Sequence, residues 1–132
     1  MSNTQGFLPA FGRLLIAILF LLSGIGKIAA PAATIGYIGS AHLPFPEVAY
    51  GVALAIELAG GLFLLVGYRV RLVAAVLAVF TLAAGLGFHS NFADQNQMIH
   101  FMKNIAIIGG LLQVVAFGAG GFSLDARGGR AA

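Results

Sequence analysis

The sequence of 132 residues contains no cysteine. This absence excludes disulfide bonds, thiolate catalysis and iron–sulfur ligation by the chain itself. Any electron transfer would therefore need a bound organic cofactor, a haem or a partner protein. Charged residues are also scarce at 8%, whereas 60% of the residues are hydrophobic. Together with a mean hydropathy of +1.00, this composition excludes an ordinary soluble domain and predicts an integral membrane protein.

Four apolar stretches are long enough to cross a bilayer, which takes about 20 residues of helix. They cover approximately residues 9–30, 48–68, 72–88 and 98–118. The sequence therefore predicts an all-α bundle of four transmembrane helices, with almost no chain left for a soluble domain.

A cleaved signal peptide is an alternative interpretation of the first stretch. Arg13 precedes an apolar run, and Ala30-Pro31-Ala32 loosely fits a small-residue cleavage site. We favour a membrane span, because the apolar run is long, Lys27 interrupts its end, and its removal would leave only three helices.

The connections between the expected spans differ in length. Tyr68 to Arg71 predicts a tight turn, which makes the second and third spans antiparallel neighbours. Residues 31–47 form a longer, semi-apolar connection that contains Pro44 and Pro46. This connection fits either a short interfacial helix that covers the bundle or a plain surface loop.

The positive charges are distributed unevenly over the two sides of a chain with four spans. The arginines all fall on one side: Arg13, Arg69, Arg71, Arg127 and Arg130. Only Lys27 and Lys103 fall towards the other side, where Glu47 and Asp94 also lie. By the positive-inside rule, both termini are expected to be cytoplasmic. The net charge of +3 does not indicate a nucleic-acid partner, because the arginines lie at helix ends and form no basic stripe.

Two pairs of short motifs suggest an internal repeat. Arg13-Leu14 opens the first span and Arg71-Leu72 the third. Gly60-Gly61-Leu62 in the second span matches Gly109-Gly110-Leu111 in the fourth. Two helical hairpins related by an axis along the membrane normal would give this pattern, although such matches also arise by chance in apolar, glycine-rich sequence.

Small residues spaced four apart predict places where helix backbones approach closely. Three such spacings occur within the spans: Gly51 with Ala55, Ala74 with Ala78, and Ala83 with Gly87.

Glu57 lies near the middle of the second apolar stretch. A carboxylate at that depth costs free energy, so it is expected to face the bundle interior, to have a partner and to serve a function. Lys27 and Lys103 are the two candidate partners, and a buried ion pair would satisfy both charges better than either alone.

Further polar residues fall in the outer half of the expected bundle. Lys27 lies about one turn inside the outer end of the first span, and His89 lies at the outer end of the third. In the fourth span, His100, Lys103 and Asn104 share one face through their i, i+3 and i+4 spacing. An acid, bases and an amide that converge in an apolar bundle are what a small-molecule site requires.

A quinone suits such a site, because its ring and tail are apolar while its carbonyls accept hydrogen bonds. In this hypothesis His89, Lys103 and Asn104 donate to the quinone and Glu57 relays protons. The alternatives are that the ion pair is purely structural and that the histidines contact lipid headgroups at the membrane surface. Copper or zinc could bind the outer histidines, but no histidine spacing supports a metal site; haem between His89 and His100 is a further alternative.

Several separated motifs resemble one known family. They are Phe88-His89, the run Gln97 to Asn104 and the run Ile108 to Leu112, with Ser23-Gly24 and Lys27, Glu57 with Gly60-Gly61, and Ser123-Leu124-Asp125. In order and spacing they are similar to the DoxX family of small bacterial membrane proteins. The likeness covers about Arg13 to Asp125, so residues 1–132 are expected to form one DoxX-like transmembrane domain.

The resemblance implies a four-helix protein of the bacterial inner membrane that is linked to redox pathways. Relatives in this family occur as subunits of thiosulfate:quinone oxidoreductase or beside oxidative-stress enzymes. The first interpretation is therefore a quinone-facing membrane component of an oxidoreductase system. In this interpretation Glu57 carries protons, and Lys103 and Lys27 are its counter-charges. His89, His100 and Asn104 line the outer mouth of the site, where it opens towards the outer side of the membrane.

This component would work with a redox protein partner or as a homo-oligomer. A non-catalytic assembly subunit is the second interpretation, and a small proton-coupled transporter, which would need to dimerise, is the third.

Overall fold

The computed structural model describes residues 3–89 and 91–129, and within these residues all regular secondary structure is helical. The helices are α1 (Asn3–Ala29), α2 (Pro31–Ser40), α3 (Pro46–Val66), α4 (Val70–Phe88), α5 (Gln95–Phe117) and α6 (Leu124–Arg127). Four of them, α1, α3, α4 and α5, are long and apolar enough to cross a membrane. The predicted all-α architecture with four spans is confirmed.

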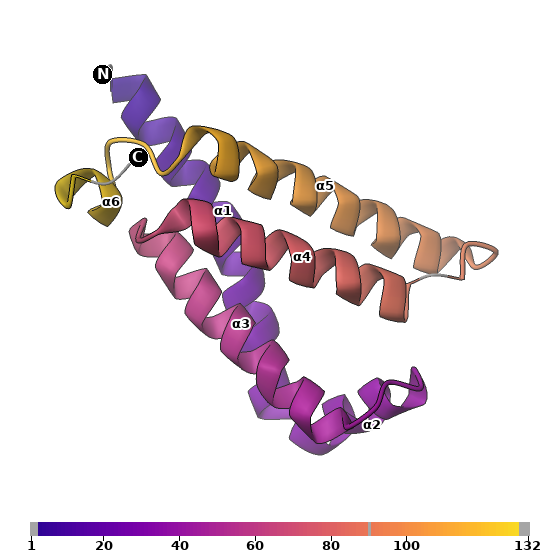
Figure 1. Cartoon of the computed structure of the whole chain (residues 1–132). Helices are drawn as coiled ribbons and strands as arrows, with labels where there is room; N and C mark the ends of the chain where they lie inside the picture. The colour runs from indigo at the N-terminus through magenta and orange to yellow at the C-terminus, as the bar shows by residue number, and fades with distance from the viewer. Residues whose placement is uncertain (1–2, 90, 130–132) are drawn as a thin grey trace.

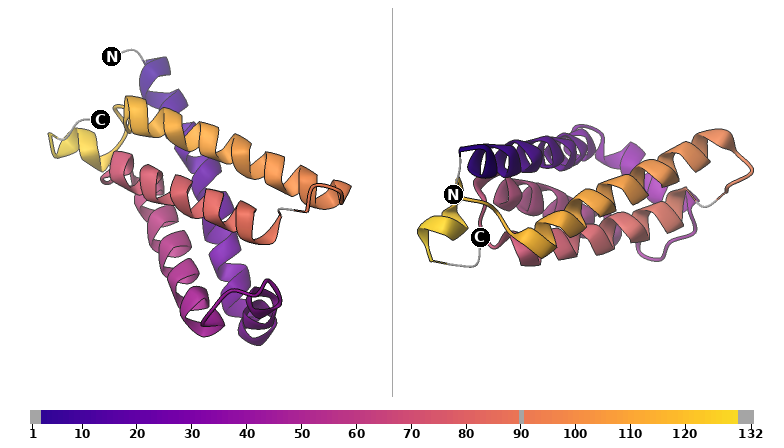
Figure 2. Two further views of the ribbon diagram at one scale, coloured as in Figure 1. Left: turned by 45° about the vertical axis from the view of Figure 1, so that its right-hand side comes forward. Right: turned by 90° about the horizontal axis from the view of Figure 1, so that it is seen from above.

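The four long helices form two hairpins that diverge from one end (Figure 1). In the first hairpin α1 packs along α3, and in the second α4 packs along α5. The hairpins join at the turn between α3 and α4, residues 67–69, which we name the closed end. At the opposite, open end lie α2 and the α4–α5 connection, and there the hairpins stand apart (Figure 2).

The helix ends follow local backbone rules. Pro31 and Pro46 occupy the first turns of α2 and α3, where a missing N–H costs nothing. Gly67, with φ of 78°, ends α3 in the left-handed conformation that glycine adopts without strain. Asp94 caps α5, because its side chain accepts hydrogen bonds from the backbone N–H groups of Asn96 and Gln97.

The core is small and lies where the helices meet. Its buried apolar residues include Ala17 and Leu64 from the first hairpin, and Ala74, Leu77 and Leu111 from the second. Most other large apolar side chains point outward, as is expected where lipid replaces water. The exposed apolar residues along the spans therefore contact the bilayer.

The predicted small-residue contacts are only partly present. Ala74 and Ala78 are buried in the core, as expected. Gly51 and Gly87 instead face open space, because a Cβ added at either would meet nothing within 4 Å. The close approach within the first hairpin uses Gly24 and Gly61. Spacing predicts that small residues lie on one face but not which face meets another helix.

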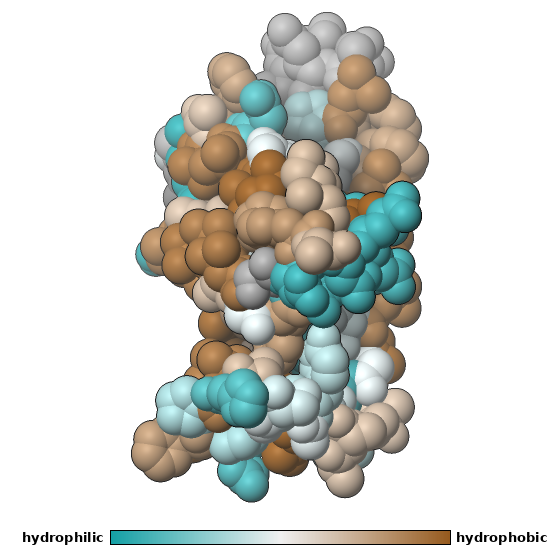
Figure 3. All heavy atoms as spheres, turned by 90° about the vertical axis from the view of Figure 1, so that its right-hand side faces the viewer, coloured by the Kyte–Doolittle hydropathy of each residue, from teal (hydrophilic) through white to brown (hydrophobic). Residues whose placement is uncertain are grey.

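The longer connection does contain a helix, α2, which packs against α3. Its Ile38 is buried, whereas Tyr37 is largely exposed. Viewed towards the open end (Figure 3), hydrophilic residues gather at the height of α2 and of the α4–α5 connection, among hydrophobic ones. Whether α2 lies at the membrane interface, and whether both termini are cytoplasmic, stay predictions. Arg130, one of the five arginines from which this orientation was predicted, lies outside the described residues.

A buried arginine ties the closed end together. Arg13 is 2% exposed and its guanidinium donates four hydrogen bonds to backbone carbonyls. The acceptors are Leu64 O at 2.8 Å, Leu65 O at 3.1 Å, Ala119 O at 3.1 Å and Phe122 O at 2.5 Å. Arg13 therefore links α1 to the end of α3 and to the segment after α5, in addition to its predicted role as a topology signal.

A buried aspartate caps α4 from a distance in sequence. Asp125 accepts hydrogen bonds from Arg69 N at 2.6 Å and Val70 N at 3.0 Å. Without Asp125, these two N–H groups at the start of α4 would have no acceptor within the helix. A negative charge at this position also interacts favourably with the helix dipole. The cap fixes the C-terminal segment against the α3–α4 turn.

The contacts of Arg71 resemble those of Arg13. Arg71 opens α4 and donates to Val115 O at 3.2 Å and Ala116 O at 3.0 Å near the end of α5. In each hairpin, an arginine of the first helix thus reaches the last carbonyls of the second. This agreement supports the repeat suggested by the sequence.

Candidate functional site

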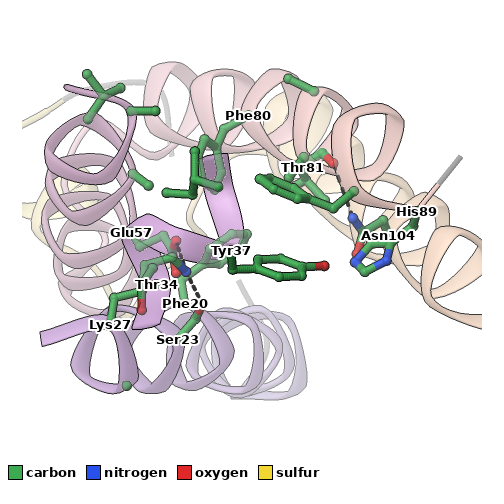
Figure 4. A pocket seen from close by; sticks show the side chains of 18 of the residues that line it. Phe20, Ser23, Lys27, Thr34, Tyr37, Glu57, Phe80, Thr81, His89 and Asn104 are labelled. Carbon is green, nitrogen blue, oxygen red and sulfur yellow. Dashed lines mark hydrogen bonds and ion pairs between the residues drawn. The ribbon is translucent and has the colours of Figure 1, made fainter. Parts of the chain in front are cut away.

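A cavity of about 660 Å³ lies between the two hairpins (Figure 4). Helices α1 to α5 all contribute to it. Most of its wall is apolar, including Leu19, Phe20, Ile38, Val52, Phe80, Phe88 and Ile107. Its polar residues are Ser23, Lys27, Thr34, Tyr37, Glu57, Thr81, His89 and Asn104. A mostly apolar cavity of this size with a few polar groups is typical of a small-molecule site, for which volumes of about 300–1,000 Å³ are usual.

Glu57 is the one acid among the described residues that line the cavity, with 2% of its surface exposed. It lies on the buried face of α3 together with Ala53, Gly61 and Leu64, at helical spacing. Its Oε1 forms an ion pair with Lys27 Nζ at 2.6 Å. Of the two candidate partners, the structure therefore selects Lys27.

The position of Lys27 is itself fixed by hydrogen bonds. Its ammonium donates to Ser23 Oγ at 2.9 Å, one turn earlier on α1. Its backbone carbonyl accepts a hydrogen bond from Tyr50 Oη of α3 at 2.8 Å. The ion pair thus joins α1 and α3 at a defined register.

The second carboxylate oxygen of Glu57 is unpaired. Across residues 3–89 and 91–129, Oε2 has no hydrogen-bond partner although it is buried. An unpaired buried acceptor costs about 1–3 kcal/mol. Since buried polar groups are normally satisfied, this atom makes Glu57 a candidate binding residue.

Asn104 and Thr81 contribute polar groups from the second hairpin. Asn104 Nδ2 donates to the backbone carbonyl of Thr81 at 3.3 Å. This bond fixes the amide beside the cavity, and no described residue uses its other N–H or its carbonyl oxygen.

His89 lies just after α4 and lines the cavity. Its ring stacks on that of His100, with 4.9 Å between the centroids and 23° between the planes. Partial burial, and then the neighbouring His100, lower the pKa of His89 below its ordinary value. A haem between the two rings would require them to move apart.

Tyr37 connects the two hairpins at the cavity. Its ring stacks on Phe88 of α4, with centroids 5.1 Å apart and planes at 17°. In Figure 4 it lies between the Lys27–Glu57 pair and the His89–Asn104 side. Tyr37 lies within the longer connection of residues 31–47 and was not predicted as a site residue; the semi-apolar pattern of that connection was the available signal.

Four of the six predicted site residues line the cavity: Glu57, Lys27, His89 and Asn104. The other two, His100 and Lys103, are exposed and do not line it. Lys103 makes no ion pair with any described residue. Asn104 turns towards α4, so Lys103, one residue earlier and about 100° around the helix, points elsewhere.

Metal ligands are not clustered in the part of the chain that the structure describes. No group of three or more His, Cys, Asp or Glu side chains is placed there to hold a metal ion.

Comparison with known proteins gives consistent matches. The sequence model of the DoxX family matches residues 8–90. The chain is 38% identical over 113 residues to inner membrane protein YqjF of Escherichia coli K12, which covers 86% of this chain and 85% of that protein. It is 29% identical over 120 residues to inner membrane protein YphA of the same organism, covering 87% of this chain and 86% of that one. No solved structure matches. The chain therefore belongs to the DoxX family and is a multi-pass protein of the bacterial inner membrane.

Proposed function

We propose that this protein is the quinone-binding membrane component of an oxidoreductase system. The observation that carries the proposal is the unpaired, buried Glu57 Oε2 in a largely apolar cavity between two membrane hairpins. A carboxylate that only held the bundle together would be expected to have both oxygens paired. One free oxygen at a cavity wall is suited to exchange a proton with a bound molecule.

The cavity lining fits the chemistry of a quinone. The apolar side chains would hold the ring, while Lys27, His89 and Asn104 would donate hydrogen bonds to the two carbonyls. The quinone, when bound, would supply the two-electron chemistry that the side chains of this chain lack. Because the sequence has no cysteine, the electrons would come from a second bound cofactor, a haem or a separate redox protein.

The cavity also borders the expected lipid phase. Leu19 of α1 is 45% exposed and Val52 of α3 is 51% exposed, although both line the cavity. A ligand between the hairpins could thus keep an apolar tail in the bilayer. This arrangement favours a membrane-dissolved substrate over a water-soluble one.

Ligand titration tests the proposal. We expect the protein in lipid nanodiscs to bind a benzoquinone with a decyl tail saturably. Ala84 lines the cavity, so Ala84→Phe should fill the site and weaken binding by at least about tenfold. Val79 lies on the same helix and is 70% exposed, so Val79→Phe is the matched control and should bind normally.

The assembly-subunit interpretation gives the opposite result. The closed end shows that this chain does use buried charges, Arg13 and Asp125, for structure. If the Lys27–Glu57 pair served only that purpose, the quinone would not bind saturably, and Ala84→Phe would change stability alone.

A further inference from the structure

The Lys27–Glu57 pair lines the cavity and has one acceptor and one donor that no described residue uses. Paired with the ammonium, the Glu57 carboxylate is an acceptor only. Its Oε1 is used by Lys27, and within the described chain its Oε2 has no partner. Lys27 has three N–H donors, of which Glu57 and Ser23 take two. A third donor therefore remains beside an unused acceptor.

A hydroxyl group satisfies this pair of sites, whereas a carbonyl does not. A hydroxyl can donate its proton to Glu57 Oε2 and accept from Lys27 at the same time. A quinone carbonyl can only accept, so it would use the lysine and leave Oε2 buried without a partner. Sites built to pair with a hydroxyl discriminate strongly against analogues that lack it, because their buried polar groups are then left unpaired.

The opposite side of the cavity also has a hydrogen-bond donor beside an acceptor. Asn104 uses one N–H for Thr81 O and so retains a donor and a carbonyl acceptor. In Figure 4 it lies across the ring of Tyr37 from the Lys27–Glu57 pair, so the polar groups gather on two sides of the cavity. A hydroxyl of a bound molecule could therefore pair with either side in the same way.

We propose, resting on the proposed function, that the cavity selects the reduced dihydroxy form, a quinol, over the oxidised quinone. Glu57 Oε2 accepts the hydrogen bond that distinguishes the two forms. The quinone differs from the quinol by two electrons and two protons, so tighter binding of the quinol raises the reduction potential of the bound couple. A tenfold preference corresponds to about 30 mV.

Three ligands with one shared decyl tail test this selection in the wild-type protein. They are the benzoquinone, its quinol, and the dimethyl ether of that quinol, whose oxygens cannot donate. Calorimetric titration into nanodiscs without oxygen should show that the quinol binds at least about tenfold more tightly than the quinone or the ether. Equal affinity for the quinol and either of the other two would overturn the selection while leaving quinone binding intact. Failure of all three to bind would overturn both proposals.

Two matched variants locate the selection. Glu57→Gln introduces an amide that can donate to a carbonyl, so the preference for the quinol should fall to within about threefold or reverse. Glu47 is exposed at the start of the same helix, and Glu47→Gln should retain the wild-type preference. A quinol preference that survives Glu57→Gln would show that Glu57 does not make the selection.

Discussion

Arg13 and Glu57 are buried charges that are satisfied to different extents. The Arg13 guanidinium donates four hydrogen bonds to carbonyls at the closed end. Glu57 has one paired oxygen and one that no described residue pairs. Arg71 is intermediate, because its Nη1 donates to two carbonyls while its buried Nε has no partner among the described residues. Glu57 differs from Arg71 in that it lines the cavity, and its unpaired oxygen therefore supports the proposed ligand.

Replacing Arg13 should destabilise the protein strongly. Arg13→Gln would leave several buried carbonyls unpaired, and at about 1–3 kcal/mol each the expected loss is about 3 kcal/mol or more. Thermal unfolding of the purified protein in detergent measures it. Arg127 is exposed in α6, so Arg127→Gln is the control and should leave the unfolding midpoint unchanged. Equal midpoints for the two variants would contradict the structural role of Arg13.

His89 should make stability depend on pH. Its pKa is lowered in the folded protein, so below about pH 6.5 the unfolded chain binds more protons than the folded one. Stability is therefore highest above that pH and falls as the pH decreases towards the folded pKa. Unfolding midpoints measured at intervals between about pH 7.5 and about pH 5 should show this decrease.

The variant His100→Gln tests the second cause of that shift. It removes the neighbouring His100 ring but leaves His89 partly buried, so the pKa of His89 should rise only part of the way to its ordinary value. Titration of the His89 ring by nuclear magnetic resonance reads this directly. An unchanged pKa would contradict a contribution from His100.

Sequence reasoning found the acid at the site but could not choose its partner. Lys27 and Lys103 are both at plausible depths, and the choice depends on how α1 and α5 rotate about their own axes. Apolar side chains surround each membrane helix, so hydrophobicity does not mark the buried face. The roles of Arg13 and Asp125 were missed for a related reason: hydrogen bonds to distant backbone groups leave no pattern in the sequence.

At the scale of elements, the helices were predicted well because span length is set by the bilayer. The predicted spans 48–68, 72–88 and 98–118 differ from α3, α4 and α5 by no more than three residues at either end. The packing between helices was predicted less well. Of three small-residue spacings only Ala74 with Ala78 is fully buried, because exposed small residues have the same spacing.

The turn that ends α3 should depend on glycine at position 67. Gly67 combines a φ of 78° with the close approach of Ser123, whose Cα would lie 2.9 Å from an added Cβ. Gly67→Ala should therefore cost about 2–4 kcal/mol, from the left-handed conformation and from overpacking. Thermal unfolding in detergent gives the change.

Gly129 provides the control for the backbone contribution. Its φ is 73°, but an added Cβ would meet nothing within 4 Å. Gly129→Ala should therefore cost at most about 1 kcal/mol. If Gly67→Ala were no more destabilising than Gly129→Ala, the contact with Ser123 would not matter.

At the scale of the whole molecule, two similar hairpins are joined at one end and enclose a cavity towards the other. The closed end is tied by Arg13 and Asp125, whereas at the open end Tyr37 and Phe88 stack across the two hairpins. The sequence motifs suggested the repeat, but not the divergence of the hairpins. That divergence depends on which faces of α3 and α4 meet, and it creates the space in which Glu57 lies.

Labelling of introduced cysteines tests the predicted orientation of this molecule in the membrane. Because the chain has no cysteine, a single introduced one is the only site of reaction. Asn91 and Gly128 are both exposed, the first in the α4–α5 connection and the second after α6. In intact cells a membrane-impermeant maleimide should label Asn91→Cys and not Gly128→Cys. The reverse pattern would show that the termini are on the outer side.

We propose that the cavity beside Glu57 holds a quinone-type molecule in the membrane. Native mass spectrometry of the protein, extracted gently from its own membrane, tests this claim most directly, because bound small molecules are weighed with the chain. We predict a stoichiometric quinone or quinol on the wild-type protein and on Val79→Phe, and its loss from Ala84→Phe. A wild-type chain that carries no such molecule, or one that Ala84→Phe retains equally, would contradict the account.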